Sequence, residues 1–168
     1  MIDVSPYEHC ACRRMQNSLS LCQGDLQIAE QGKTVRLTLR RNEEAKVLVL
    51  DGCVFTDADK KCDAVYLFKS KSKKVIALVE LKGAQHLMKA FAQLAHTRFN
   101  RPQYGYIKNH LDQSGPGKCV EKAFVVSNGQ LSKPEISRLE NFHGIRVSAI
   151  VSSEPTANVP DLRGWLIA

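Results

Sequence analysis

The sequence lacks the features that identify membrane-spanning and secreted chains. No apolar run approaches the roughly 18 residues that a membrane span needs. The N-terminal segment, from Met1 to Pro6, does not have the basic-then-apolar order of a signal peptide. We therefore expect a cytoplasmic protein that does not bind a membrane.

Two further motifs are missing: a glycine-rich phosphate loop and the paired Cys-x-x-Cys spacing of most zinc sites. The chain has 6 cysteines. In a cytoplasmic protein they are expected to be free thiols or ligands rather than disulfides, and burial as small apolar side chains explains all of them. A structural zinc site built from Cys10, Cys12, Cys22 and a fourth ligand is the alternative.

What the sequence does contain indicates one globular domain over residues 1–168. Hydrophobic residues make up 43% and charged residues 24% of the chain, which excludes a disordered tail protein. The net charge of +7 makes a polyanionic partner more plausible. Lysines gather in one stretch, which indicates either a solvated hairpin or a contact with phosphates; they are Lys60, Lys61, Lys69, Lys71, Lys73 and Lys74.

The hydrophobic periodicity predicts an α/β domain with a mixed central sheet flanked by helices on both faces. The expected strands are 35–39, 45–50, 62–68, 75–81, 122–127 and 145–151. Helices are expected over 84–98 and from the Ser132 capping box to about residue 142, where Gly144 ends the second one. Helical turns are also expected at 13–21 and 26–31, and a long loop with a short helix at 106–111.

Three charged residues stand at the ends of two expected core strands. Asp63 opens one strand, and Glu80-Leu81-Lys82 closes the next. Residues two apart share a face, and a hairpin turning at 70–72 places Asp63 opposite Glu80, so these side chains should meet in one pocket. Two carboxylates, with the Leu81 carbonyl as a further ligand, would suit Mg²⁺ or Mn²⁺.

This pattern resembles the PD-(D/E)XK nuclease superfamily, which has the restriction-endonuclease-like fold. The resemblance consists of Asp63, sixteen intervening residues, Glu80-x-Lys82 and a following amphipathic helix, within an αβββαβ core over about residues 30–150. It implies a metal-dependent nuclease in which Asp63 and Glu80 bind the ion and Lys82 assists the attacking water. In this family an aspartate on the second core strand and a Glu-x-Lys on the third carry these roles.

The resemblance extends to residues outside the three-residue motif. Gln93 resembles the glutamine that exonuclease-like branches carry on the helix after the motif, although the tyrosine usual four residues later is Thr97 here. Many members carry a glutamate on the first core helix, for which Glu30 is the candidate and Glu8 the reserve. The expected nucleic-acid contacts are lysines, namely Lys69, Lys71, Lys73, Lys74 and Lys89.

The expected partner is nucleic acid, with DNA ahead of RNA. A chain of this length leaves little room for sequence readout, so a homodimer or a larger protein partner is also expected. Restriction, repair, recombination and phage defence all fit such an enzyme. Two alternatives stay open: a non-catalytic nucleic-acid-binding or assembly subunit with a nuclease-like fold, and an interaction module organised by a cysteine-bound metal.

Overall fold

A five-stranded mixed sheet forms the centre of the protein. The computed structural model describes residues 1–14 and 18–168. The strands follow chain order across the sheet: β3 (Glu44–Val49), β4 (Ala64–Lys69), β5 (Lys74–Leu81), β6 (Cys119–Ser127) and β7 (Ala149–Ser152). The β3–β4 and β4–β5 pairs are antiparallel, whereas β5–β6 and β6–β7 are parallel. The predicted α/β class and mixed sheet are therefore confirmed.

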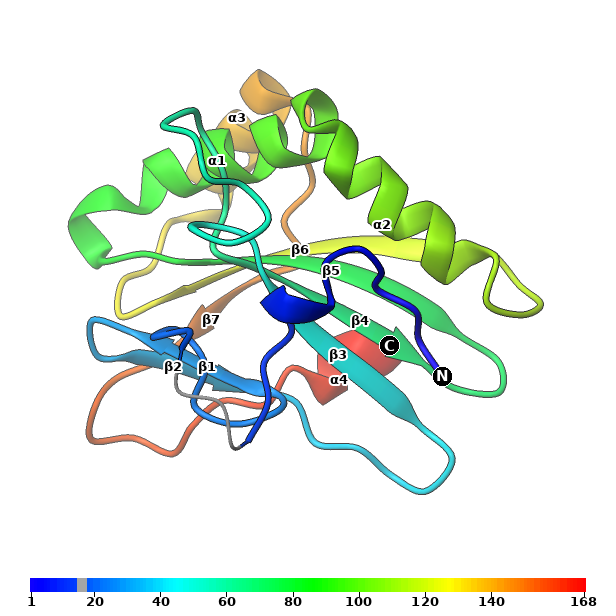
Figure 1. Cartoon of the computed structure of the whole chain (residues 1–168). Helices are drawn as coiled ribbons and strands as arrows, with labels where there is room; N and C mark the ends of the chain where they lie inside the picture. The colour runs from blue at the N-terminus through cyan, green and yellow to red at the C-terminus, as the bar shows by residue number, and fades with distance from the viewer. Residues whose placement is uncertain (15–17) are drawn as a thin grey trace.

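The two faces of the sheet are covered differently (Figure 1). The helices α1 (Leu87–Asn100), α2 (Pro102–Asp112) and α3 (Lys133–His143) lie on one face. The hairpin β1 (Gln27–Glu30) and β2 (Lys33–Arg36) lies on the other, together with the short helix α4 (Arg163–Ile167). In the described part of the chain, no helix is both long and apolar enough to cross a membrane.

Alternating residues of the central strands supply two cores, one on each face. In β5, Ile76 and Leu78 pack toward the helices, and Val75 and Ala77 pack toward the hairpin and α4. Every residue of β5 is buried. An apolar run without alternation is the expected pattern of a strand covered on both sides. The charged residue near the end of β5 is therefore buried as well, and a buried charge needs a partner.

The caps of α3 follow the sequence prediction. The Ser132 side chain accepts a hydrogen bond from the Glu135 amide, and the Glu135 side chain in turn accepts one from the Ser132 amide. Gly144 ends the helix in the left-handed region at φ 68°. Side chains with a β-carbon rarely adopt that backbone conformation, so glycine suits it.

Two local predictions were wrong, and a third falls partly on residues that the structure does not describe. Residues 26–31 are not helical. Within this range β1 pairs with β2, and the Ile28 side chain of β1 is fully buried in the core. The loop expected after residue 100 contains α2, a full helix that begins at Pro102. The helical turn expected at 13–21 includes residues 15–17, which lie outside the described residues, and the described remainder of that range holds no helix.

Candidate active site

Asp63 and Glu80 lie side by side where β4 begins and β5 ends. The strand register pairs Ala64 with Val79, so the next residues outward, Asp63 and Glu80, oppose each other. The Asp63 amide donates to Glu80 Oε1 at 2.9 Å, and the Leu81 amide donates to Asp63 Oδ2 at 2.8 Å. Both carboxyl side chains are buried, at 7% and 1% exposure. The structure therefore brings together the two acids that the hairpin register predicts, with the Leu81 peptide beside them.

Lys82 completes the motif on the other side of Glu80. Its Nζ lies 3.1 Å from Glu80 Oε2, and its side chain is partly exposed. The Lys82 amide donates to the Val126 carbonyl at 2.9 Å, which extends the pairing between β5 and β6 to this residue. Glu80 thus accepts from the Asp63 amide through one oxygen and pairs with Lys82 through the other.

Burial is the main electrostatic influence on both acids. It raises the pKa of Asp63, and the negative charge of Glu30 raises it further. Burial also raises the pKa of Glu80, with an added contribution from Asp63, while the Lys82 ammonium opposes the change. The ionised pair consequently needs more positive charge than Lys82 alone supplies.

Two hollows lie beside the motif, one lined by Asp63 and the other by Lys82, and they differ in the charge of their lining. Glu30, Asp51 and Asp63 line an acidic pocket of about 240 Å³. Lys82 lines a separate groove of about 570 Å³ on the side of α1, and Asp51 borders both hollows. Glu80 is thus in contact with both Asp63 and Lys82, as the sequence predicts, although Asp63 lines the acidic pocket and Lys82 lines the groove.

Glu30 reaches the acidic pocket from a strand rather than from a helix. It is the last residue of β1, and its side chain is exposed. The expectation that the upstream acid lies on a first core helix is therefore wrong, although Glu30 itself borders the same pocket as Asp63. The reserve candidate Glu8 lies elsewhere and pairs with Arg13 and Lys46, at 3.0 and 3.1 Å.

The donor atoms at Asp63 and Glu80 fit a hard divalent cation. Carboxylate oxygens are preferred by Mg²⁺ and Mn²⁺, and Mg²⁺ commonly uses one or two carboxylates together with substrate phosphates and water. No third His, Cys, Asp or Glu ligand atom groups with these two within 4.8 Å among the described residues. The residues present therefore fit an ion that is completed by water and substrate.

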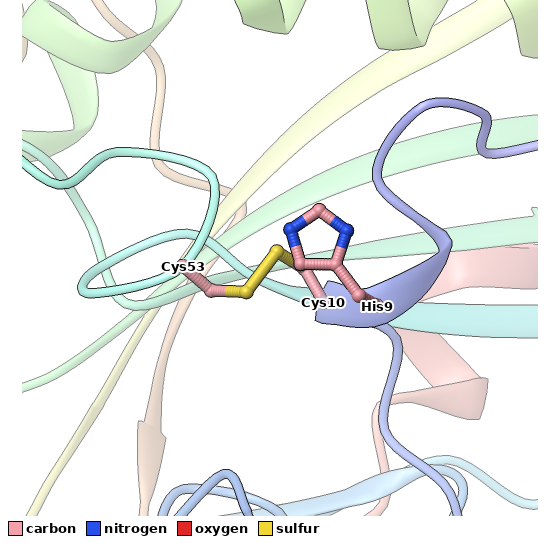
Figure 2. A group of neighbouring side chains, drawn as sticks. All are labelled: His9, Cys10 and Cys53. Atoms are coloured by element: carbon pink, nitrogen blue, oxygen red, sulfur yellow. A yellow bond between two sulfur atoms is a disulfide. The ribbon is translucent and has the colours of Figure 1, made fainter.

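Four of the 6 cysteines form disulfides, which corrects the sequence predictions for these four. Cys10 pairs with Cys53, and Cys12 pairs with Cys22. Figure 2 shows His9 beside the Cys10–Cys53 bond, where each sulfur is already bonded to the other. The alternative of one zinc site is also corrected, because Cys10 and Cys12 belong to the cores on opposite faces of the sheet.

The free thiols that remain are Cys62 and Cys119. Cys62 is fully buried, as the sequence predicts for a small apolar side chain. Disulfides are rare in cytosolic proteins, so the cytoplasmic location stays a prediction without support from the cysteines.

The loop between β3 and β4 lines part of both hollows and is held in place at two points. The Cys10–Cys53 disulfide holds its beginning to the N-terminal segment. Arg101 holds its middle, because the guanidinium donates to both carboxylate oxygens of Asp57, at 2.6 and 2.8 Å, and to the Lys60 carbonyl. Side-chain hydrogen bonds from Arg101 hold the pKa of Asp57 well below its usual range. No local sequence pattern predicts this clamp, because Asp57 and Arg101 are 44 residues apart in the chain.

The fastened loop supplies half of the groove beside Lys82. The loop contributes Lys60 and Lys61, and helix α1 contributes Lys89 and Gln93. Four lysines and two aspartates line the groove, so its net charge is positive; the complete lining is Asp51, Ala58, Asp59, Lys60, Lys61, Lys82, Lys89, Ala92 and Gln93. A groove of this composition attracts phosphate groups.

Gln93 lies in the groove with half of its amide unused. Its Nε2 donates to the Lys61 carbonyl at 3.3 Å. Its Oε1 is buried and has no hydrogen-bond partner within the described residues. Buried acceptors are normally paired, so this oxygen is an unsatisfied acceptor at the wall of the groove.

Thr97, the residue that departs from the expected tyrosine, fixes the strand that carries Asp63. Its hydroxyl accepts from the Cys62 amide at 2.9 Å and donates to the Gln93 carbonyl at 2.8 Å. The side chain is fully buried. This contact joins α1 to the residue directly before Asp63.

We expect Thr97→Val to lower the free energy of unfolding by about 1–3 kcal/mol, because the Cys62 amide would be buried without an acceptor. Urea denaturation measures the change. Thr156→Val, at an exposed loop position, is the matched control and should have little effect. Equal stability of the two variants would contradict the assignment.

The lysines of the β4–β5 hairpin do not border the site. Lys69 and Lys74 pair at the turn, six residues along the ladder from Asp63 and Glu80, which corresponds to about 20 Å. Lys74 is buried and donates to the Asp112 and Gly115 carbonyls, Lys69 donates to the Ser114 carbonyl, and Lys73 donates to the Ala168 carbonyl. Lys71 alone of these four is exposed. A nucleic-acid contact here would be remote from Asp63 and Glu80.

Comparison of the chain with protein-family models, with curated proteins and with solved structures found no match.

Proposed function

We propose that the chain is a metal-dependent nuclease of the PD-(D/E)XK type, which hydrolyses phosphodiester bonds of DNA or RNA. The observation that carries this proposal is the buried pair of Asp63 and Glu80, with Lys82 Nζ 3.1 Å from Glu80, at the edge of a lysine-lined groove.

The order of elements supports the proposed fold family. The strands β3, β4 and β5 are followed by the helices α1 and α2 and then by β6, which corresponds to the βββαβ part of the family core with one added helix. Asp63 lies directly before β4 and Glu80 lies at the end of β5, the strands on which the family carries its motif. In the chain as described, the β1–β2 hairpin precedes β3 where the family has a helix.

The proposed chemistry divides among the residues by their positions. Asp63 and Glu80 would hold the ion, which supplies polarisation of the scissile phosphodiester group and activation of a water. Lys82 places a positive charge where negative charge grows on the phosphate during attack, and it orients the water. Gln93 accepts a hydrogen bond from that water or from the substrate through its unused Oε1.

The groove accounts for substrate binding. Lys60, Lys61 and Lys89 line it beside Lys82, so a bound phosphate backbone would pass over the ammonium nearest to Glu80. Contacts of this kind position the strand but carry little sequence information. The proposal therefore includes DNA and RNA substrates without a defined recognition sequence.

A cleavage assay with Lys82→Met tests the proposal. Purified protein is incubated with plasmid, single-stranded DNA and RNA in Mg²⁺, Mn²⁺ or EDTA. We expect cleavage in either metal, none in EDTA, and a fall of about 100-fold or more in Lys82→Met, since one charge that stabilises the transition state is removed.

Lys108→Met is the matched control, because Lys108 on α2 also pairs with a partly buried glutamate, Glu121, at 3.3 Å, but lines neither the acidic pocket nor the groove. It should cleave at the wild-type rate. If the wild-type protein binds nucleic acid and does not cleave it under any of these conditions, the nuclease is excluded and the non-catalytic subunit is favoured.

A further inference from the structure

Three large apolar side chains are exposed together where α1 packs against α3. Met88 is 50% exposed, Phe99 is 56% exposed and Phe142 is 82% exposed. Phe142 borders two hollows, one shared with Met88 and Leu139 and the other shared with Phe99 and His96. Figure 1 shows α1 and α3 on the same side of the sheet. A cluster of exposed apolar side chains of this kind indicates a binding surface.

This surface is continuous with the lysine groove. Lys60 and Ala92 line both the groove and the hollow beside Phe99, and Lys89 lines both the groove and the hollow beside Met88. Lys89, His96 and Phe99 are spaced by seven and three residues along α1, so they share one face of that helix. One track therefore leads from Lys82 to Phe142, and we name it the α1–α3 track.

Both cationic and aromatic side chains line the α1–α3 track. Arg138 and His143 border the outer hollow together with Phe142. The Phe142 and His143 rings lie edge to face, with centroids 4.8 Å apart, and Phe142 is largely exposed to the solvent. Asp59 partly offsets the positive charge and is paired with His96 at 3.2 Å.

The combination favours one kind of occupant. A polyanion satisfies the lysines, but a duplex buries the flat faces of its bases in its own stack. A single strand offers both phosphates and unpaired bases, and aromatic side chains stack on unpaired bases of any sequence. A purely apolar protein surface would leave the adjoining lysines without partners.

We propose that the α1–α3 track binds single-stranded nucleic acid, with phosphates along Lys60 and Lys89 and an unpaired base stacked on Phe142. This inference deepens the proposed function and rests on it, because it names the form of strand that reaches Lys82.

Binding is measured by fluorescence anisotropy in EDTA, so that cleavage does not contribute. The probes are labelled oligonucleotides of about 12 nucleotides as single-stranded DNA, single-stranded RNA and duplex DNA. We expect tighter binding of the single strands than of the duplex. Phe142→Ala should weaken single-strand binding about five-fold or more, and Phe142→Trp should retain it. Tyr106→Ala, an exposed aromatic position on α2, is the control and should bind normally.

Salt dependence separates the lysine contacts from the stacking contact. Lys89→Ala should lower the slope of log affinity against log salt by about 0.7, the value for one phosphate contact of a single strand, while Phe142→Ala should leave the slope unchanged. The DNA and RNA probes identify which strand chemistry is preferred.

Three results would overturn the inference. These are duplex binding as tight as single-strand binding, a Phe142→Ala variant with wild-type affinity, and self-association of the protein that Phe142→Ala abolishes, since the patch would then join two copies. Single-strand binding without any cleavage would keep the inference and exclude the nuclease. Cleavage of duplex DNA by Phe142→Ala at the wild-type rate would support the nuclease and exclude the inference.

Discussion

Glu80→Gln is expected to abolish metal-dependent cleavage and, at the same time, to stabilise the protein. Glutamine keeps an acceptor for the Asp63 amide but removes the charge that would bind the ion. We expect the cleavage rate to fall by about 100-fold or more, as for other single groups that stabilise the transition state.

The stability effect follows from the direction of the pKa shift. Burial, followed by the charge of Asp63, raises the pKa of Glu80 in the folded protein, so the folded state binds the proton more tightly than the unfolded state does. The resulting stabilisation is complete below the ordinary glutamate pKa of about 4.3 and is lost as the pH rises toward the folded-state pKa. Glu80→Gln removes this loss, so its free energy of unfolding should exceed that of the wild type at neutral and alkaline pH.

Thermal and urea unfolding between about pH 5 and about pH 9 measure the difference, and Glu121→Gln is the control. Burial alone would raise the pKa of Glu121, but the Tyr104 hydroxyl and the charges of Arg98 and Lys108 together lower it. Glu121→Gln should therefore destabilise the protein at neutral pH, the opposite sign. A destabilised Glu80→Gln variant would show that Glu80 is stabilised in its ionised form and would contradict the electrostatics described for the site.

Removal of the Cys10–Cys53 disulfide is expected to have the largest effect on stability. The bond joins residues 43 apart in the chain. Closing a loop of that length in the unfolded chain corresponds to about 4 kcal/mol of stabilisation. We expect the double variant Cys10→Ser and Cys53→Ser to lose about that amount in urea denaturation.

The second disulfide provides a matched comparison. Cys12 and Cys22 are only 10 residues apart, and removing that bond should cost about 3 kcal/mol. The Cys10–Cys53 variant should also lose more cleavage activity, because Cys53 lies in the loop that carries Lys60 and Lys61 into the groove.

Titration of the unfolded, unreduced protein should find 2 thiols, Cys62 and Cys119. A titration that finds all 6 cysteines free would contradict both pairings.

Local pattern was sufficient to predict the central strands and the meeting of Asp63 with Glu80. A strand covered on both faces is apolar at successive positions, so the charged residues at its end stand out in the sequence. The short turn between β4 and β5 then fixes the register, which places the two acids opposite each other. The capping box and Gly144 likewise determine the ends of α3 through contacts within a few residues.

Long-range packing decided what surrounds those acids. The pairing of Cys10 with Cys53, the clamp between Arg101 and Asp57, and the approach of Glu30 to Asp63 all join segments whose separation the sequence does not encode locally. Tertiary packing also buries Lys74, which donates to the Gly115 carbonyl after α2, and it places Lys89 in the lining of the groove. The sequence alone determined the strands and the three charged residues at their ends, because periodicity and turn length act over neighbouring residues. Only the tertiary structure decided which loop, cations and aromatic side chains lie around them, because those contacts depend on how distant segments pack.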